Sequence, residues 1–255
     1  MIALYLATGA LTGLTAGLLG VGGGLIVVPA LAFLFARAGL YPDHLMHVAL
    51  GTSLATIIVT SVASILAHQR HRAIRWPDVA RIAPGLAIGA LAGGLLADRI
   101  ATSLLQAGFG LFVIVVALNM LFGKTVVAGE ERGRPNPGAG LMIGLVSALT
   151  GIGGGSMTVP YLAWKGRPLR NAIATSAACG LPIALAATAG FVWSGREVTQ
   201  SVSGYVNATA FLAIVMVSIF TAPLGAILAH RLPVAMIKKV FAGFLIVVGL
   251  RMLWM

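Results

Sequence analysis

Apolar residues dominate ten segments of this chain, and short polar or glycine-rich stretches separate the segments from one another. The segments are residues 2–19, 25–36, 45–67, 78–98, 102–122, 139–150, 157–165, 172–193, 202–229 and 233–254. The apolar runs 104–122 and 211–229 are long enough to cross the hydrocarbon layer of a bilayer as helices, which takes about 20 residues. The pattern predicts an all-α, polytopic membrane protein.

Composition supports this class and excludes others. Hydrophobic residues make up 59% of the 255 residues and charged residues only 9%, whereas soluble domains carry charge on roughly a quarter of their residues. The net charge of +11 comes from basic residues in short loops without an aromatic-rich face, so we expect membrane lipid and no nucleic acid as a partner. Cys179 is the single cysteine, which excludes an intramolecular disulfide and a cysteine-based metal cage. No basic residue precedes the first apolar segment, and we interpret that segment as a span rather than a signal peptide.

A glycine cluster occurs twice in the chain. It reads Gly-x-Gly-Gly-Gly at residues 20–24 and again at 151–155, and a proline follows five residues after each cluster. Residues 13–31 and 144–162 match at ten of nineteen positions, which indicates an internal duplication. Each glycine costs a helix about 1 kcal/mol relative to alanine, so we expect the helices to break at both clusters.

The duplication extends over nearly the whole chain, because residues 109–122 and 241–254 also match, at eight of fourteen positions. It predicts a first transmembrane repeat at 1–122 and a second at 139–255, with five apolar segments in each. The linker between them, 123–138, is polar and contains prolines, and we expect it to be cytoplasmic.

The distribution of lysine and arginine predicts how the repeats are oriented. If the chain reverses direction at each glycine cluster, thirteen basic residues collect on one side of the membrane and four on the other. If each cluster lies inside one uninterrupted span, the division is eight against nine, with no bias. The positive-inside rule therefore favours inverted repeats with both termini on the outer side of the membrane. The short segments 25–36 and 157–165 are expected to be broken or re-entrant helices.

Inverted repeats bring the two clusters together near the middle of the membrane, where broken helices of transporters bind substrates. Free amides, helix N-termini and hydroxyls at such a break suit a small anion. The candidate binding residues are Gly22, Gly23, Gly24, Thr52, Ser53, Thr150, Gly153, Gly154, Gly155, Ser156, Thr158, Thr175 and Ser176. His47 and Arg170 each lie five residues before a Thr-Ser pair and are candidates for attracting the anion or for anchoring a helix end. The alternative for the small residues is that they only allow helices to pack closely.

Other kinds of site find little support in the sequence. All six carboxylates fall at segment ends or in loops, which weighs against a cation channel and against a proton relay of buried acids. The chain contains no His-Glu-x-x-His or Gly-x-Ser-x-Gly motif, so we expect no enzyme activity, no metal and no cofactor. The glycine spacing lacks the βαβ context of a nucleotide loop.

The doubled Gly-x-Gly-Gly-Gly-x₄-Pro element and the two Ala-x-x-Thr-Ser pairs, at 49–53 and 172–176, resemble the sulfite exporter TauE/SafE family of membrane permeases. The resemblance covers essentially the full chain. It implies a transporter of a bacterial inner membrane for sulfite, sulfonates or another small sulfur-containing anion, so the termini are expected to be periplasmic. We expect export without a coupled ion. Two alternatives stay open: a cation-coupled importer of such an anion, and a membrane-embedded enzyme or assembly factor. The second cluster leads into Ser156-Met157-Thr158 where the first leads into Leu25-Ile26-Val27, so the polar groups concentrate in the second half.

Overall fold

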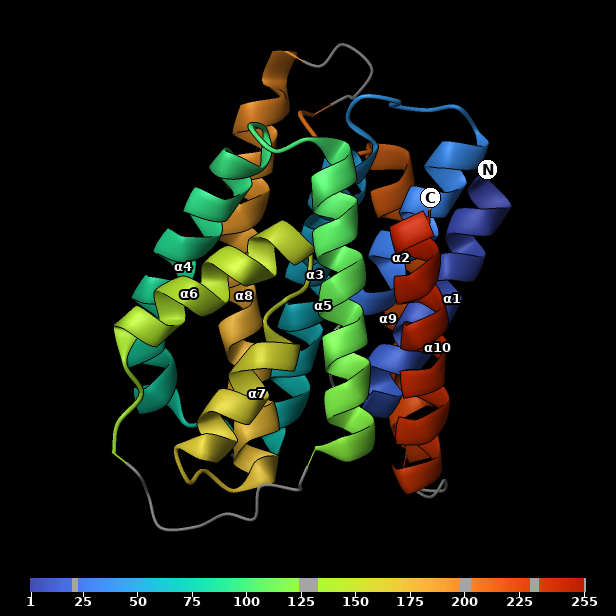
Figure 1. The fold of residues 1–255 in the computed structure, drawn as a ribbon. Helices are drawn as coiled ribbons and strands as arrows, with labels where there is room; N and C mark the ends of the chain where they lie inside the picture. The colour runs from blue at the N-terminus through green and yellow to red at the C-terminus, as the bar shows by residue number, and fades with distance from the viewer. Residues whose placement is uncertain (20–22, 124–132, 198–202, 230–233, 255) are drawn as a thin grey trace.

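The computed structural model describes residues 1–19, 23–123, 133–197, 203–229 and 234–254, and these residues fold almost entirely into helices (Figure 1). The α-helices are α1 (Ile2–Leu19), α2 (Gly24–Arg37), α3 (Leu45–Arg70), α4 (Trp76–Ala97), α5 (Thr102–Phe122), α6 (Pro137–Thr150), α7 (Gly155–Trp164), α8 (Leu169–Ser194), α9 (Ala208–Ala229) and α10 (Val234–Trp254). Each apolar segment of the sequence corresponds to one helix. The all-α prediction is confirmed for the described residues.

Several helix starts differ from the predicted boundaries, and the residues at the helix start explain two of them. Helix α9 begins at Ala208 and not near residue 202, because the side chain of Asn207 accepts a hydrogen bond from Ala210 N at 2.8 Å. Helix α6 begins at Pro137, inside the predicted linker, where proline suits the first helical position.

Among the described residues, four helical stretches are long and apolar enough to cross a membrane: α3, α4, α5, and α8 together with the short 3₁₀ helix η1 (Gly195–Glu197). Large apolar side chains cover the outside of the bundle. On α5, for example, Leu104 and Leu111 are 65% and 60% exposed. Such an apolar surface is suited to lipid contact.

Helices of the first half pack against helices of the second half. Helix α1 of the first half packs along α9 of the second, and α6 of the second half packs along α4 of the first. Helices α3 and α8 pack against each other in the interior, and Figure 1 shows α5 and α10 side by side, running in opposite directions. Both termini lie toward the same end of the molecule.

The α1–α9 and α4–α6 pairs pack through glycines spaced four residues apart. A Cβ atom at Gly9 of α1 would lie 2.6 Å from Ile214 O of α9, and a Cβ at Gly140 of α6 would lie 2.6 Å from Ile82 O of α4. No side chain fits at these distances. Glycine therefore lets the backbones approach closely, as in other membrane helix pairs.

Helices α2 and α7 end with the same glycine cap. Gly39 has φ +63° and Leu40 N donates to Phe35 O at 2.9 Å, while Gly166 has φ +82° and Arg167 N donates to Leu162 O at 3.0 Å. This Schellman arrangement stops each helix and turns the chain toward the next one. The helices that follow, α3 and α8, have 26 residues each and form the centre of the bundle.

Candidate functional site

The second glycine cluster separates α6 from α7. Gly151 has φ +65° and Gly154 has φ +76°, a region that side-chain-bearing residues rarely adopt, so the predicted break is confirmed here. Gly154 is also the N-cap of α7 and has no side chain, and no side-chain hydrogen bond caps this end of the helix. The first amides of α7 therefore present N–H donors and the positive end of the helix dipole.

The two glycine clusters are in contact. A Cβ atom at Gly24 would overlap Gly151 O and would lie 3.0 Å from Ile152 Cα, so the start of α2 lies directly against the break between α6 and α7. Gly151 O also accepts a hydrogen bond from Ser53 Oγ at 2.8 Å. Gly23 is buried beside Thr12. Candidate Gly22 lies outside the described residues.

Three of the candidate hydroxyls are buried without a hydrogen-bond partner in the described part of the chain. They are Ser156 Oγ and Thr158 Oγ1 in the first turn of α7, and Ser176 Oγ on α8. Thr158 is 0% exposed and Ser176 is 1% exposed. Because a buried hydroxyl without a partner costs about 1–3 kcal/mol, these groups call for an explanation, and a ligand supplies one.

The other candidate hydroxyls hold backbone groups. Thr52 Oγ1 accepts from Asn207 N at 2.9 Å and Thr175 Oγ1 accepts from Arg75 N at 3.1 Å. These two bonds tie α3 and α8 to the residues that precede α9 and α4. Thr150 Oγ1 donates to Val146 O within α6 at 2.8 Å. The structure therefore gives these hydroxyls positioning contacts, whereas their binding to an anion stays a prediction.

Helices α3 and α8 enclose the break. A Cβ at Gly153 would meet Ile57 of α3 at 2.7 Å. A Cβ at Gly180 of α8 would lie 3.0 Å from both Gly153 O and Ser61 Oγ. The backbone of residues 151–155 thus lies between the two central helices, and Gly180 of α8 lies beside both Gly153 and the hydroxyl of Ser61 on α3.

His47 and Arg170 occupy different environments despite their matching positions. His47 is 2% exposed, its Nε2 lies 2.9 Å from Ala97 O, and its Nδ1 lies 3.3 Å from Thr102 Oγ1. This geometry favours the anchoring role for His47. Arg170 is exposed in the first turn of α8. The structure does not bring these two side chains together, and their attraction of an anion stays a prediction.

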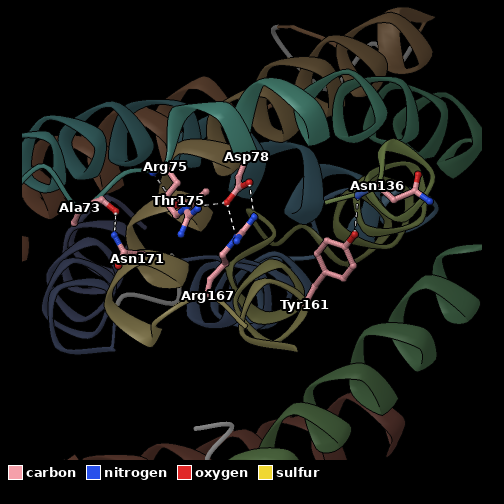
Figure 2. Close-up of polar contacts among 8 residues, drawn as sticks. All are labelled: Ala73, Arg75, Asp78, Asn136, Tyr161, Arg167, Asn171 and Thr175. Atoms are coloured by element: carbon pink, nitrogen blue, oxygen red, sulfur yellow. Dashed lines mark hydrogen bonds and ion pairs between the residues drawn. The ribbon is translucent and has the colours of Figure 1, made fainter. Parts of the chain in front are cut away.

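A buried ion pair lies at the end of the molecule formed by the α3–α4 connection (71–75) and the α7–α8 connection (165–168), which we term the basic end. Arg167 Nε lies 2.8 Å from Asp78 Oδ2, and Arg167 Nη2 donates to Asp78 Oδ1 at 3.0 Å. Arg75 Nε lies 3.2 Å from the same Oδ2. Figure 2 shows both guanidinium groups pointing toward the Asp78 carboxylate. The Asp78 and Arg167 side chains are only 3% and 4% exposed.

A second polar cluster closes the opposite end. Tyr205 is 1% exposed, its hydroxyl donates to Asp98, and His44 Nδ1 lies 3.2 Å from the same hydroxyl. Burial first, and then the hydrogen bond to Asp98, raise the pKa of Tyr205 above its ordinary value of 10.0. The hydroxyl thus stays protonated and able to donate at neutral pH.

Comparison with known proteins identifies the family. A family model described as "Sulfite exporter TauE/SafE" matches residues 5–252. This chain belongs to the TauE/SafE family. Its relatives in the family include a "Probable membrane transporter protein" of Haemophilus influenzae, 35% identical over 98% of this chain and 97% of that protein. A probable membrane transporter protein of Methanocaldococcus jannaschii is 28% identical over 99% of this chain and 96% of its own length. No solved structure matches the chain.

TauE/SafE membership and the apolar helices make this chain a multi-pass membrane transporter, so the resemblance of the doubled glycine motif is confirmed. The names of its relatives specify transport and no substrate.

Sequence reasoning about this TauE/SafE protein missed Ser61, Gly180, Asp78 and Arg167. Ser61 and Gly180 belong to no repeated motif, and only the fold shows that Gly180 lies beside both Gly153 and Ser61. Asp78 stands at a segment end, a position usually exposed to solvent. Its burial depends on α8 and on the α7–α8 connection, which are distant in sequence. One signal was available, because Gly166-Arg167 follows α7 in the position that Gly39-Leu40 occupies after α2.

Proposed function

We propose that this transporter exports a small sulfur-containing oxyanion, such as sulfite or an organosulfonate. The observation that carries the proposal is the set of buried hydroxyls without partners, Ser156, Thr158 and Ser176, beside the uncapped start of α7. Hydroxyls and amide N–H groups donate hydrogen bonds, and the oxygens of an oxyanion accept them. Hydrogen bonds to a charged group are stronger than hydrogen bonds between neutral groups. A bound anion therefore offsets the free-energy cost of burying these donors.

The proposed arrangement is a pair of inverted repeats in a bacterial inner membrane, with both termini in the periplasm. The packing between the halves supports it. A two-fold relation between the halves requires that α6 packs on α4 if α1 packs on α9, and both contacts are present. The excess of lysine and arginine on one side, thirteen against four, supports the orientation. In this arrangement the contact between Gly24 and Gly151 lies near the midplane, where transporters of this construction bind substrate.

The proposed direction is outward and driven by the membrane potential alone. Moving one negative charge out of an inside-negative cell gains about 2.3 kcal/mol per 100 mV, so an exporter needs no coupled ion. An importer must overcome the same energy and commonly uses a buried carboxylate to bind a cation. Asp78, the buried carboxylate at the start of α4, already pairs with Arg167. This pairing favours export over cation-coupled import.

Transport in proteoliposomes tests the proposal. We expect purified protein to move labelled sulfite or an organosulfonate, with the direction of net flux reversing when a valinomycin-imposed potassium potential is reversed. Ionophores that collapse only the proton or sodium gradient should leave the flux unchanged. Loss of flux on collapsing either gradient at constant potential would indicate the coupled importer. No flux of any sulfur oxyanion would point to the membrane-embedded enzyme or assembly factor.

A further inference from the structure

The residues of the ion pair at the basic end differ in type from the residues at the matching positions of the two halves. Arg167 follows the glycine cap of α7, and the residue in the same place after α2 is Leu40. Asp78 is the third residue of α4, and the third residue of α9, the matching helix of the second half, is Ala210. Ala210 is 0% exposed, and Leu40 packs against the hydrophobic core. Each half therefore contributes one member of the buried charge pair, Asp78 or Arg167, and has an apolar residue at the position that matches the other member.

Stability does not explain this difference. Removing two charges from water costs several kcal/mol per ion, and replacing a buried ion pair with apolar residues is often neutral or stabilising. The Leu40 and Ala210 positions are a natural example, because the same fold accepts apolar residues there. The pair at the basic end therefore calls for a role other than holding the fold together.

The geometry of the pair matches recognition of an oxyanion. Arg167 directs Nε and Nη2 toward the two oxygens of Asp78, at 2.8 and 3.0 Å, in the two-pronged arrangement by which arginine binds carboxylates and other oxyanions. Arg75 contacts the same carboxylate at 3.2 Å, and its side chain is 36% exposed. Two guanidinium groups thus face the Asp78 carboxylate.

The cluster is connected to the hydroxyls of the candidate site. Helix α7 carries Ser156 and Thr158 in its first turn and leads directly to Arg167 after its last, a distance of about 15 Å for its 10 residues. On α8, the buried hydroxyl of Ser176 follows Thr175, whose side chain accepts a hydrogen bond from Arg75 N. The hydroxyls of the candidate site and Arg167 therefore lie at the two ends of the same helix.

We propose that Arg167 binds the transported oxyanion at the basic end of the path, and that Asp78 occupies its guanidinium in the absence of that anion. This inference rests on the proposed function, since the ligand is the same sulfur oxyanion. When the oxyanion arrives, its oxygens take the two N–H donors of Arg167, and Asp78 keeps its contact with Arg75. Asp78 is thus a competitor for Arg167, and the two residues affect affinity in opposite directions.

Single substitutions test whether Asp78 and Arg167 affect the affinity for the oxyanion in opposite directions. Asp78→Asn removes the competing charge and should lower the sulfite concentration for half-maximal flux in proteoliposomes. Arg167→Gln removes charged hydrogen bonds and should raise it roughly tenfold or more. Arg72→Gln is the matched control, because Arg72 is an exposed arginine in the α3–α4 connection at the same end. It should leave the half-saturation concentration unchanged.

A double variant separates binding from folding. Asp78→Ala with Arg167→Leu introduces the residue types found at the two matching positions, Ala210 and Leu40. The double variant should therefore insert and keep a thermal midpoint at or above that of the wild type. Its half-saturation concentration should nevertheless stay raised, as in Arg167→Gln. A double variant with wild-type half-saturation, or single variants that both shift in the same direction, would show that the pair is only structural. Sulfite flux by the wild type in the same vesicles tests the proposed function separately, because its absence would overturn that function whatever the variants do.

Discussion

Thr158→Val is the substitution that best separates substrate binding from folding. The Thr158 side chain is completely buried at the start of α7, and its hydroxyl has no partner within the described residues. Valine has nearly the same shape, with a methyl group in place of the hydroxyl. The substitution therefore changes hydrogen-bonding capacity and leaves the packing around Gly154 almost as it is.

The two expected effects have opposite signs. Removing a buried hydroxyl that lacks a partner should stabilise the anion-free protein by up to about 1–3 kcal/mol, the free energy that such burial costs. If Thr158 donates to the oxyanion, the loss of one hydrogen bond to a charged group costs about 1.5–3 kcal/mol. That loss corresponds to roughly 10- to 150-fold weaker binding.

Thermal unfolding in detergent, with and without sulfite, measures both effects, and flux in proteoliposomes gives the half-saturation concentration. Sulfite at a hundred times its dissociation constant should stabilise the wild type by about 2.7 kcal/mol. Thr158→Val should begin at a higher midpoint and gain less from sulfite.

Thr188→Val is the matched control. Its hydroxyl is also buried without a partner in the described residues, but it lies on α8 eight positions beyond Gly180. It should raise the midpoint and leave the response to sulfite unchanged. A Thr158→Val protein with a lower midpoint and wild-type sulfite affinity would refute the reasoning, because the hydroxyl would then have a structural role and no part in binding.

Three further predictions concern the helix break, the topology and the polar cluster of Tyr205 opposite the basic end. Gly154→Val should abolish flux in inserted protein, because φ +76° excludes valine, whereas Gly108→Val, with open space around it, should transport normally; equal flux in both would reduce the cluster to a packing motif. In a cysteine-free background, a cysteine at Arg196 should react with an impermeant reagent added to intact cells and one at Arg134 should not; the reverse pattern would overturn the inverted arrangement. Tyr205→Phe should lower the thermal midpoint by removing a hydrogen bond to a carboxylate. Because the folded pKa of Tyr205 is raised above 10.0, the difference from wild type should persist to about pH 9 and shrink only at higher pH; a difference lost near neutral pH would contradict this account.

Local rules explain the features that could be predicted from the sequence. Apolar runs located all ten helices, and the free-energy cost of glycine in a helix located the break between α6 and α7. The duplication added one non-local prediction, that the two clusters approach each other, and the contact of Gly24 with Gly151 confirms it. Boundaries were less accurate where a single cap decided them, as Asn207 does for α9.

The partners of the buried polar groups could not be predicted from the sequence, because they depend on which residues the fold brings into contact. Thr175 and Ser176 are neighbours in the sequence, yet one hydroxyl meets Arg75 N and the other meets no partner in the described residues. Position along a helix likewise gave no indication that Asp78 is buried. Its partner Arg167 is 89 residues away in the sequence, and no local pattern relates the two.

The packing of α1 on α9 has a consequence for biosynthesis. Helix α1 is made before α9, and the residues that its glycines contact, Ile214 and Ser218, are made about 205 residues after those glycines. At 5–20 residues per second this delay is roughly 10–40 s. During that time the close-packing face of α1 has no protein partner, and the lipid or the insertion machinery must hold the helix in the membrane. The α1–α9 pair of this transporter thus forms only after the helices between α1 and α9 have been synthesised.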